Sequence, residues 1–306
     1  MRRPQVISIA AGLILLISAS ACGVDESIPK SAAGEASPEA TTVAAPEPKH
    51  QDFDSGSFDN PTVIDNEWMP MRPGMQWVFD GYTTEEDEKI PHRIEFTITD
   101  LTKEIEGVRT VVAWIVDISD GEVVEKEIAF YAQDNDGNVW YFGEHPEEYE
   151  GGKFVKASTW IAGCEDARPG VKMWANPTRE IPPYFQGWGP AVGWSDYAQI
   201  DKGLNQACVP AGCYEGILVI AETSLGETDI YQLKHYARGV GEIRTGWRGE
   251  PKTPEGLRLA EQVQLSQEAL AAVRADALAL EEHAYKISVG VLDQTVPSEV
   301  EHASGG

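Results

Sequence analysis

The sequence is short of positive charge, of cysteine and of histidine. It has 24 Lys and Arg against 50 Asp and Glu, a formal net charge of −26, with four cysteines and six histidines among 306 residues. A surface this acidic repels the phosphates of nucleic acids and the headgroups of anionic lipids. We therefore expect no nucleic-acid partner, and we expect membrane contact to come through an attached lipid.

Long apolar runs and the common catalytic motifs are also missing. The apolar run at 6–17 (VISIAAGLILLI) is too short to span a bilayer comfortably. The patterns G-x-S-x-G, H-E-x-x-H and the P-loop do not occur, and the six histidines are scattered along the chain. The sequence therefore assigns no catalytic residue, and we expect no cofactor.

The N-terminus has the layout of a secretory signal peptide at 1–21. Two arginines precede the apolar run, and Ala19-Ser20-Ala21 precedes Cys22. This junction resembles the lipobox of bacterial lipoproteins, although that pattern usually has Leu where Ala19 stands. The resemblance implies that Cys22 carries fatty acyl groups such as palmitate and anchors the protein on the outer side of the cell membrane. The alternative is an ordinary signal peptide with an incidental cysteine.

Residues 22–50 differ in composition from the rest of the chain. This stretch has no aromatic residue and is rich in Ala, Pro, Glu, Ser and Thr. It cannot bury enough apolar surface to offset the entropy lost on ordering. We expect a disordered tether between the lipidated cysteine and a folded body that begins near residue 51.

The clearest structural signal is a β-hairpin. The segments 127–133 (EIAFYAQ) and 138–144 (NVWYFGE) flank Asp134-Asn135-Asp136-Gly137, a tight-turn sequence. Short connections join further strand-like runs and favour antiparallel neighbours. These runs lie at 76–82, 92–101, 108–118, 153–160, 214–224 and 228–247. The sequence predicts a mainly β protein of α+β type, with a curved antiparallel meander or open half-barrel sheet at 51–250.

The C-terminal region, 251–306, has a helical pattern. Thr253-Pro254-Glu255 is typical of a helix start. Apolar or small residues then recur at spacings of four and three from Leu259 to Ile287. We predict one helix of about 45–50 Å, packed on the sheet and followed by a polar tail.

Beyond Cys22 the chain has Cys164, Cys208 and Cys213, which can form one disulfide. The turn sequence Val-Pro-Ala-Gly separates the last two and favours a bridge between them in an oxidising compartment. Pairing of Cys164 with either of them remains the alternative.

Asp134, Asp136 and Asn138 have the spacing that begins a calcium-binding loop. Gly137 then stands at the fourth position where that loop needs glycine at the sixth, and His145 occupies the position of the final glutamate. A hairpin turn explains these residues better, so we expect no metal and keep the three only as weak candidates.

The hairpin YAQDNDGNVWYFGE resembles a motif of an uncharacterised family of secreted bacterial proteins. That family has later segments like YARGVGEIR (236–244), and this segment is also similar to strand ends in half-barrel lipoproteins. The resemblance implies an architecture and an extracytoplasmic address but no reaction. FQGWGPAVGW (185–194) departs from the usual version of the family.

The loop with Phe185, Trp188 and Trp194 is the candidate binding surface, because aromatic rings beside Gly and Pro present apolar area to a ligand. The same rings could instead plug one end of the sheet. We predict a non-catalytic binding module for an apolar or aromatic ligand or for an envelope protein. The alternative is a hydrolase of an envelope or extracellular polymer, for which a pocket with paired carboxylates would be the sign.

Overall fold

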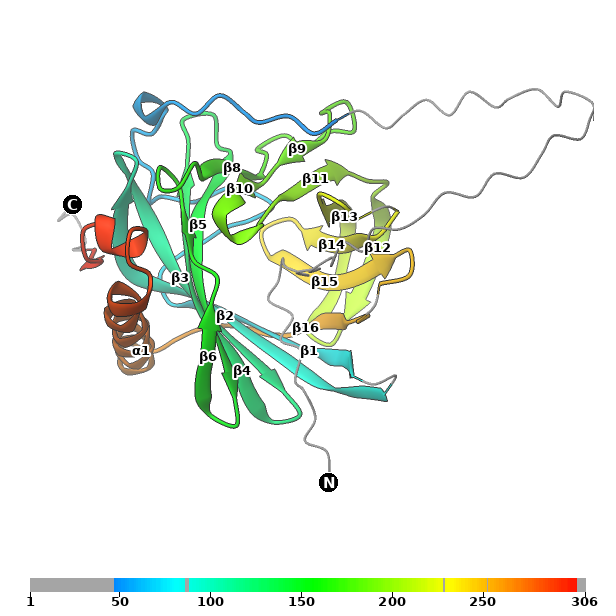
Figure 1. The fold of residues 1–306 in the computed structure, drawn as a ribbon. Helices are drawn as coiled ribbons and strands as arrows, with labels where there is room; N and C mark the ends of the chain where they lie inside the picture. Colours follow the sequence, from blue (N-terminus) through cyan, green and yellow to red (C-terminus); the bar gives the residue numbers. More distant parts are fainter. Residues whose placement is uncertain (1–46, 86–87, 228, 252, 302–306) are drawn as a thin grey trace, which may run out of the picture.

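The computed structural model describes residues 47–85, 88–227, 229–251 and 253–301. Their strands form one curved antiparallel sheet that wraps around an interior without closing, and a single C-terminal α-helix lies outside it (Figure 1). The predicted fold class is thus confirmed. Within the described part, this helix is not long and apolar enough to cross a membrane.

The strands differ widely in length, from two residues to eighteen. They are β1 (Met75–Glu85), β2 (Glu88–Ile105), β3 (Val108–Ser119), β4 (Glu122–Gln133), β5 (Val139–Glu150), β6 (Lys153–Ala157), β7 (Trp160–Ile161), β8 (Arg168–Met173), β9 (Tyr184–Phe185), β10 (Gly187–Trp188), β11 (Asp196–Ile200), β12 (Leu204–Val209), β13 (Gly212–Ser224), β14 (Tyr231–Ala237), β15 (Gly241–Arg248), β16 (Gly256–Gln264) and β17 (Glu299–Val300). Three short 3₁₀ helices lie at Ser55–Ser57, Pro190–Val192 and Leu292–Gln294.

The main ladder runs in the order β11, β13, β14, β15, β16, β1, β2, β3, β4 and β5, with each strand antiparallel to the next. At one end β5 pairs with β6, β7 and β8, and β8 pairs with β10. At the other end β9 pairs with β11. Because β9 and β10 are almost consecutive in the chain, the segment 184–188 lies between the two ends of the sheet.

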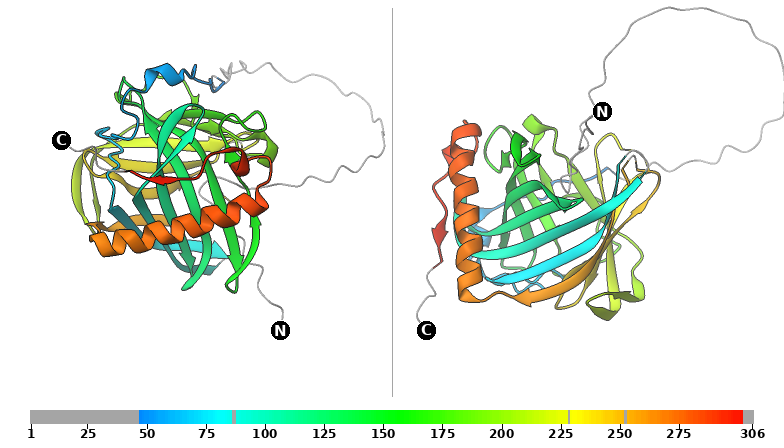
Figure 2. Two further views of the ribbon diagram at one scale, coloured as in Figure 1. Left: turned by 90° about the vertical axis from the view of Figure 1, so that its left-hand side faces the viewer. Right: turned by 90° about the horizontal axis from the view of Figure 1, so that it is seen from below.

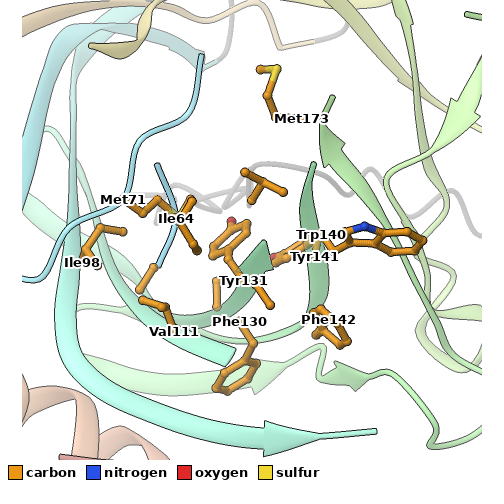
Figure 3. Close-up of a cluster of buried hydrophobic side chains, with 14 of the residues drawn as sticks. Ile64, Met71, Ile98, Val111, Phe130, Tyr131, Trp140, Tyr141, Phe142 and Met173 are labelled. Atoms are coloured by element: carbon orange, nitrogen blue, oxygen red, sulfur yellow. The ribbon is translucent and has the colours of Figure 1, made fainter. Parts of the chain in front are cut away.

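The predicted hairpin forms β4 and β5, and its turn has the expected geometry. Gly137 has φ +85°, a conformation that glycine adopts without steric cost. The Asp134 carboxylate accepts hydrogen bonds from the backbone N–H groups of Asp136 and Asn138, at 3.0 and 2.8 Å. Residues alternate across the two strands: Tyr131 and Tyr141 stack at 4.8 Å between ring centroids, while Phe130 points away from them (Figure 3).

The predicted start of the C-terminal helix is wrong. Residues 256–264 form β16, which pairs with both β1 and β15, and so the sheet extends past residue 250. A spacing of four between Leu259 and Val263 fits the two-residue period of a strand as well as a helical turn. Helix α1 covers only Gln267–Ile287, about 31 Å at 1.5 Å per residue, and the side chain of Ser266 caps it.

Helix α1 packs across the outer face of β2 and β4, as Figure 2 shows. Two ion pairs join it to β2. The Lys103 ammonium, only 1% exposed, lies 2.7 Å from a carboxylate oxygen of Glu281, and Arg274 Nε donates to Asp100 Oδ1 at 2.7 Å. Lys103 also donates to the Tyr285 hydroxyl and to the Val296 carbonyl, which ties the segment after the helix to the sheet.

Candidate functional site: an acidic interior cavity

The concave side of the sheet encloses a cavity. The space open to the centre of a water molecule is about 150 Å³. An engineered cavity of about this size in another protein binds benzene, so the space suits a ligand with one aromatic ring. Apolar side chains from the segment before β1 and from four strands line one side: Met69, Met71, Trp77, Phe79, Ile94, Phe96, Ile115 and Leu257.

The remaining lining is polar and mostly acidic. It comes from β3, β4, β5, β8, β14 and β15 and from the residue just before β16. Six carboxyl groups face two ammonium groups, with tyrosines and other polar groups between them: Asp117, Glu125, Glu127, Glu144, Glu242, Glu255, Lys172, Lys234, Tyr131, Tyr141, Tyr236, Gln232 and Thr245. Trp194 completes the lining. The protein's acidity therefore extends into its interior.

Strand alternation explains the acidic side of the cavity on β4. Glu125, Glu127 and Tyr131 lie two and four residues apart, so their side chains share the concave face of the strand. All three are more than nine-tenths buried. The sequence contained a signal for this site, namely glutamates at the same alternate positions of the strand as the aromatic Tyr131. Recognising the hairpin did not by itself reveal that these positions face inward.

A β-bulge brings Glu144 to the same place. Phe130 pairs with Gly143 and Tyr131 pairs with Tyr141, so Phe142 is an extra residue on β5. Tyr141 and Glu144 both line the cavity although they lie three positions apart on β5. The Tyr141 hydroxyl donates a hydrogen bond to the Glu144 carboxylate.

Burial makes these carboxyl groups hard to ionise. It raises the pKa of Glu144 to about 8, with a further contribution from the charge of Glu127. Burial raises the pKa of Glu127 to about 7 against the opposing effect of Lys234 and Lys172. The pKa of Glu125 rises well above its ordinary value, first because of burial and then because of Glu127. Near neutral pH, Glu127 and Glu144 are therefore only partly ionised.

The two lysines share a carboxylate behind the cavity lining. Glu222 lies 3.2 Å from Lys172 Nζ and 3.1 Å from Lys234 Nζ, and Gln186 Nε2 donates to Glu222 at 2.9 Å. Burial raises the pKa of Glu222, but the two lysines and Gln186 outweigh burial and hold it at about 2. Glu222 thus stays ionised and offsets part of the positive charge of the lysines.

A histidine lies between two of the carboxyl groups that line the cavity. His92 Nε2 lies 2.7 Å from Asp117 Oδ1, and His92 Nδ1 lies 3.7 Å from Glu255 Oε2. Burial lowers the pKa of His92, but the hydrogen bond and charge of Asp117 outweigh burial and raise it. Gln232 Nε2 donates to Glu255 at 2.6 Å, and burial raises the pKa of Glu255 to about 7.

Two buried polar atoms of lining residues have no hydrogen-bond partner within the described part of the chain. They are Glu125 Oε2 and Trp194 Nε1. Glu125 is 3% exposed and Trp194 is 2% exposed. Leaving a buried polar group unpaired costs about 1–3 kcal/mol, which water or a ligand in the cavity would recover.

The three aromatic residues singled out in the sequence do not form one surface. Trp194 lines the cavity and packs on Trp160, with ring centroids 4.6 Å apart. Phe185 is buried and stacks on His50 at 4.1 Å, with the half-buried Trp188 against both rings. Neither Phe185 nor Trp188 is part of the cavity lining.

The remaining candidate residues lie away from the cavity. Cys208 and Cys213 form a disulfide, Cys164 is free, and Cys22 lies outside the described residues. The Asp134 carboxylate is already bonded at both oxygens, to the two turn N–H groups and to the side chains of Asn138 and Trp140. The described residues contain no group of three or more His, Cys, Asp or Glu side chains placed to hold a metal ion.

No protein-family model matches this chain, and no curated protein matches it. Solved structures are similar to it, two of which follow. One is a presumed exported protein with a YmcC-like fold from Bacteroides fragilis, with 13% identity, a TM-score of 0.36, and coverage of 65% of this chain and 99% of that one. The other is a presumed lipoprotein from Parabacteroides distasonis, with 14% identity, a TM-score of 0.36, and coverage of 65% and 100%. Similarity at this level is no evidence for a function of this chain.

Proposed function

We propose that the protein is an exported, lipid-anchored binding protein that holds a small apolar or aromatic ligand inside its curved sheet. The cavity of about 150 Å³ beside Trp77, Phe79 and Phe96 carries the proposal. Its size and its apolar lining suit one ring, and burying that ring would provide most of the binding free energy. Export and anchoring rest on the signal-peptide pattern and on Cys22.

Titration with benzyl alcohol tests this function. We would use the full chain with Cys22→Ser, which needs no detergent, and follow binding by calorimetry. Ile115 lines the cavity from β3, and Ile115→Trp should fill the space and weaken binding at least tenfold. Ile90→Trp is the matched control, because Ile90 is equally half-buried on the neighbouring strand β2 but does not line the cavity. Equal losses of benzyl alcohol affinity in both variants, or no binding of any single-ring probe, would overturn the proposal.

The alternative, a hydrolase, draws on one observation. Glu127 and Glu144 have pKa values of about 7 and 8, so one carboxyl group can be protonated while its neighbour is ionised, as an acid–base pair requires. However, most of the lining side chains are nearly fully buried, whereas a polymer chain needs an open cleft. Hydrolysis of an envelope polysaccharide or peptide that Glu144→Gln abolishes would favour the enzyme over the binding protein.

A further inference from the structure

We propose that the ligand of this cavity carries a positively charged nitrogen beside its apolar ring, and that Glu125, whose Oε2 has no hydrogen-bond partner among the described residues, and the neighbouring Glu127 receive that charge. The inference rests on the binding function proposed above and specifies the class of ligand. A primary ammonium or a similar small organic cation fits.

The balance of charge around the cavity comes first. Six carboxyl groups line it, and the only two ammonium groups of the lining, Lys172 and Lys234, are both in contact with Glu222 behind it. The lysines are therefore partly neutralised before a ligand enters. An anionic ligand would meet surplus carboxylates, while a cationic one would relieve their mutual repulsion.

The second observation is the free acceptor. Glu125 lines the cavity and is 3% exposed, and its buried Oε2 accepts no hydrogen bond from the described residues. Buried acceptors are nearly always paired, so an unpaired one at a cavity marks the place of a donor. An ammonium group has three donors and no acceptor, and thus matches a carboxylate without leaving a lone pair opposed to it.

The third observation is the aromatic surroundings. Tyr131 lies four residues from Glu127 on β4 and stacks on Tyr141, and both rings line the cavity. Trp194 lies against Tyr141 with ring centroids 5.8 Å apart. The faces of such rings attract cations when water is excluded. A ring with a short ammonium arm could therefore fill the apolar side and place its charge among tyrosines and carboxylates.

Binding of a cation should displace protons. Around Glu125 stand the carboxyl groups of Asp117 on β3, Glu127 on β4, and Glu144 and Glu148 on β5, each of which raises its pKa. Lys172 and Lys234 on β8 and β14 lower the pKa of Glu127, while Asp117 raises it. Asp117, the cross-strand neighbour of Glu125, holds His92 together with Glu255, and Glu242 lies near Lys234. A bound cation favours the ionised carboxylates, so protons leave as it enters and affinity rises with pH.

The experiment compares three single-ring probes of the same size in the full chain with Cys22→Ser: benzylammonium, benzyl alcohol and benzoate. At pH 8.0 benzylammonium should bind at least tenfold more tightly than benzyl alcohol, and benzoate should bind most weakly. At pH 5.5, where the amine is still protonated, the preference for the cation should fall at least threefold. Calorimetry in two buffers of different ionisation enthalpy should show proton release with benzylammonium and none with benzyl alcohol.

Variants assign the charge to named residues. Glu125→Gln and Glu127→Gln should each reduce the ratio of benzylammonium affinity to benzyl alcohol affinity at least threefold. Glu122→Gln is the matched control, because Glu122 lies on the same strand but is exposed. Equal affinity for the cation and the alcohol in the unmodified cavity would overturn the cation preference and leave the binding function standing. Failure of all three probes to bind would overturn the binding function itself.

Discussion

Tyr141 and Glu144 face the same cavity and share a hydrogen bond, although they lie three positions apart on β5. On a regular strand, residues three apart point to opposite faces. The bulge opposite Phe130 and Tyr131 inserts one extra residue into β5, so that Tyr141 and Glu144 point to the same face. Gly143 makes the bulge possible, because its φ of +137° is one that other residues rarely adopt and a Cβ there would lie 2.3 Å from the carbonyl oxygen of Trp160.

Gly143→Ala should therefore destabilise the protein strongly. The variant combines an unfavourable φ with a clash against backbone, and we expect a loss of about 3 kcal/mol or more. Gly121→Ala is the control, because Gly121 also has a positive φ, +81°, but nothing lies within 4 Å of its added Cβ. That variant should lose about 1–2 kcal/mol. Chemical denaturation measures the free energy of unfolding of both variants. Equal losses in Gly143→Ala and Gly121→Ala would contradict the role given to Gly143 in the bulge.

Lys103→Met should lower the free energy of unfolding by weakening the contact between helix α1 and the sheet. It leaves the buried carboxylate of Glu281 without its ammonium partner, at a cost of about 3–5 kcal/mol. Arg274→Met breaks a more exposed ion pair with Asp100 on the same two elements and should cost about 1 kcal/mol or less. Urea denaturation should show a larger loss in the free energy of unfolding for Lys103→Met than for Arg274→Met. The reverse order would show that the buried ion pair does not hold the helix on the sheet.

Stability should fall as pH rises through the neutral range. The folded-state pKa of Glu144, about 8, lies above its ordinary value of 4.5, so the folded protein binds this proton more tightly than the unfolded chain does. The stabilisation is complete below pH 4.5 and is lost as pH approaches and passes 8. Asp196 and Glu255, with pKa values of about 7, act in the same direction.

Glu144→Gln isolates that contribution. The drop in melting temperature between pH 5 and pH 8.5 should be smaller in this variant than in the parent protein, because Gln has no proton to lose. Glu222→Gln should not reduce the drop, since the pKa of Glu222 is lowered to about 2 and its effect lies in acid. Parallel melting curves for the parent and Glu144→Gln would contradict a buried, raised-pKa carboxyl group at this position.

The disulfide should be local and modest in effect. Cys208 and Cys213 pair at the turn between β12 and β13, so the bridge closes a short loop and should contribute about 2 kcal/mol. Non-reducing peptide mapping should find these two joined, with the half-buried Cys164 open to alkylation after unfolding. A crosslink from Cys164 to either partner would contradict the pairing.

The lipid anchor is tested at Cys22. Cys22→Ser should move the protein from the membrane fraction to the soluble fraction, since removal of the acyl chains leaves an acidic surface with no affinity for anionic lipids. Detergent-phase partitioning of the two proteins measures this directly. If both partition alike, the export signal is an ordinary signal peptide and the cysteine is incidental.

The local signals in the sequence were sufficient for the hairpin and for the sheet. Asp134 to Gly137 closes a turn whose geometry depends only on residues a few positions apart, and the two-residue alternation of the neighbouring strands survives in the fold. The end of the C-terminal helix also followed from its own residues. Its start did not, because the spacing from Leu259 to Val263 fits both periods, and pairing with β1 and β15 made this stretch β16.

Only the tertiary structure could place the cavity. Glu125 and Glu127 lie on an inward face because the sheet curves around them, and Glu144 joins them through a bulge that a count of residues does not reveal. Trp194 reaches the same space from a loop, whereas Phe185 and Trp188 pack elsewhere. The sequence by itself determined the hairpin and the strands next to it, since turns and alternation are local, but it did not determine β16. Charged side chains from six strands lie close together because the sheet curves and distant strands pair. No short stretch of the chain encodes this curvature or this pairing.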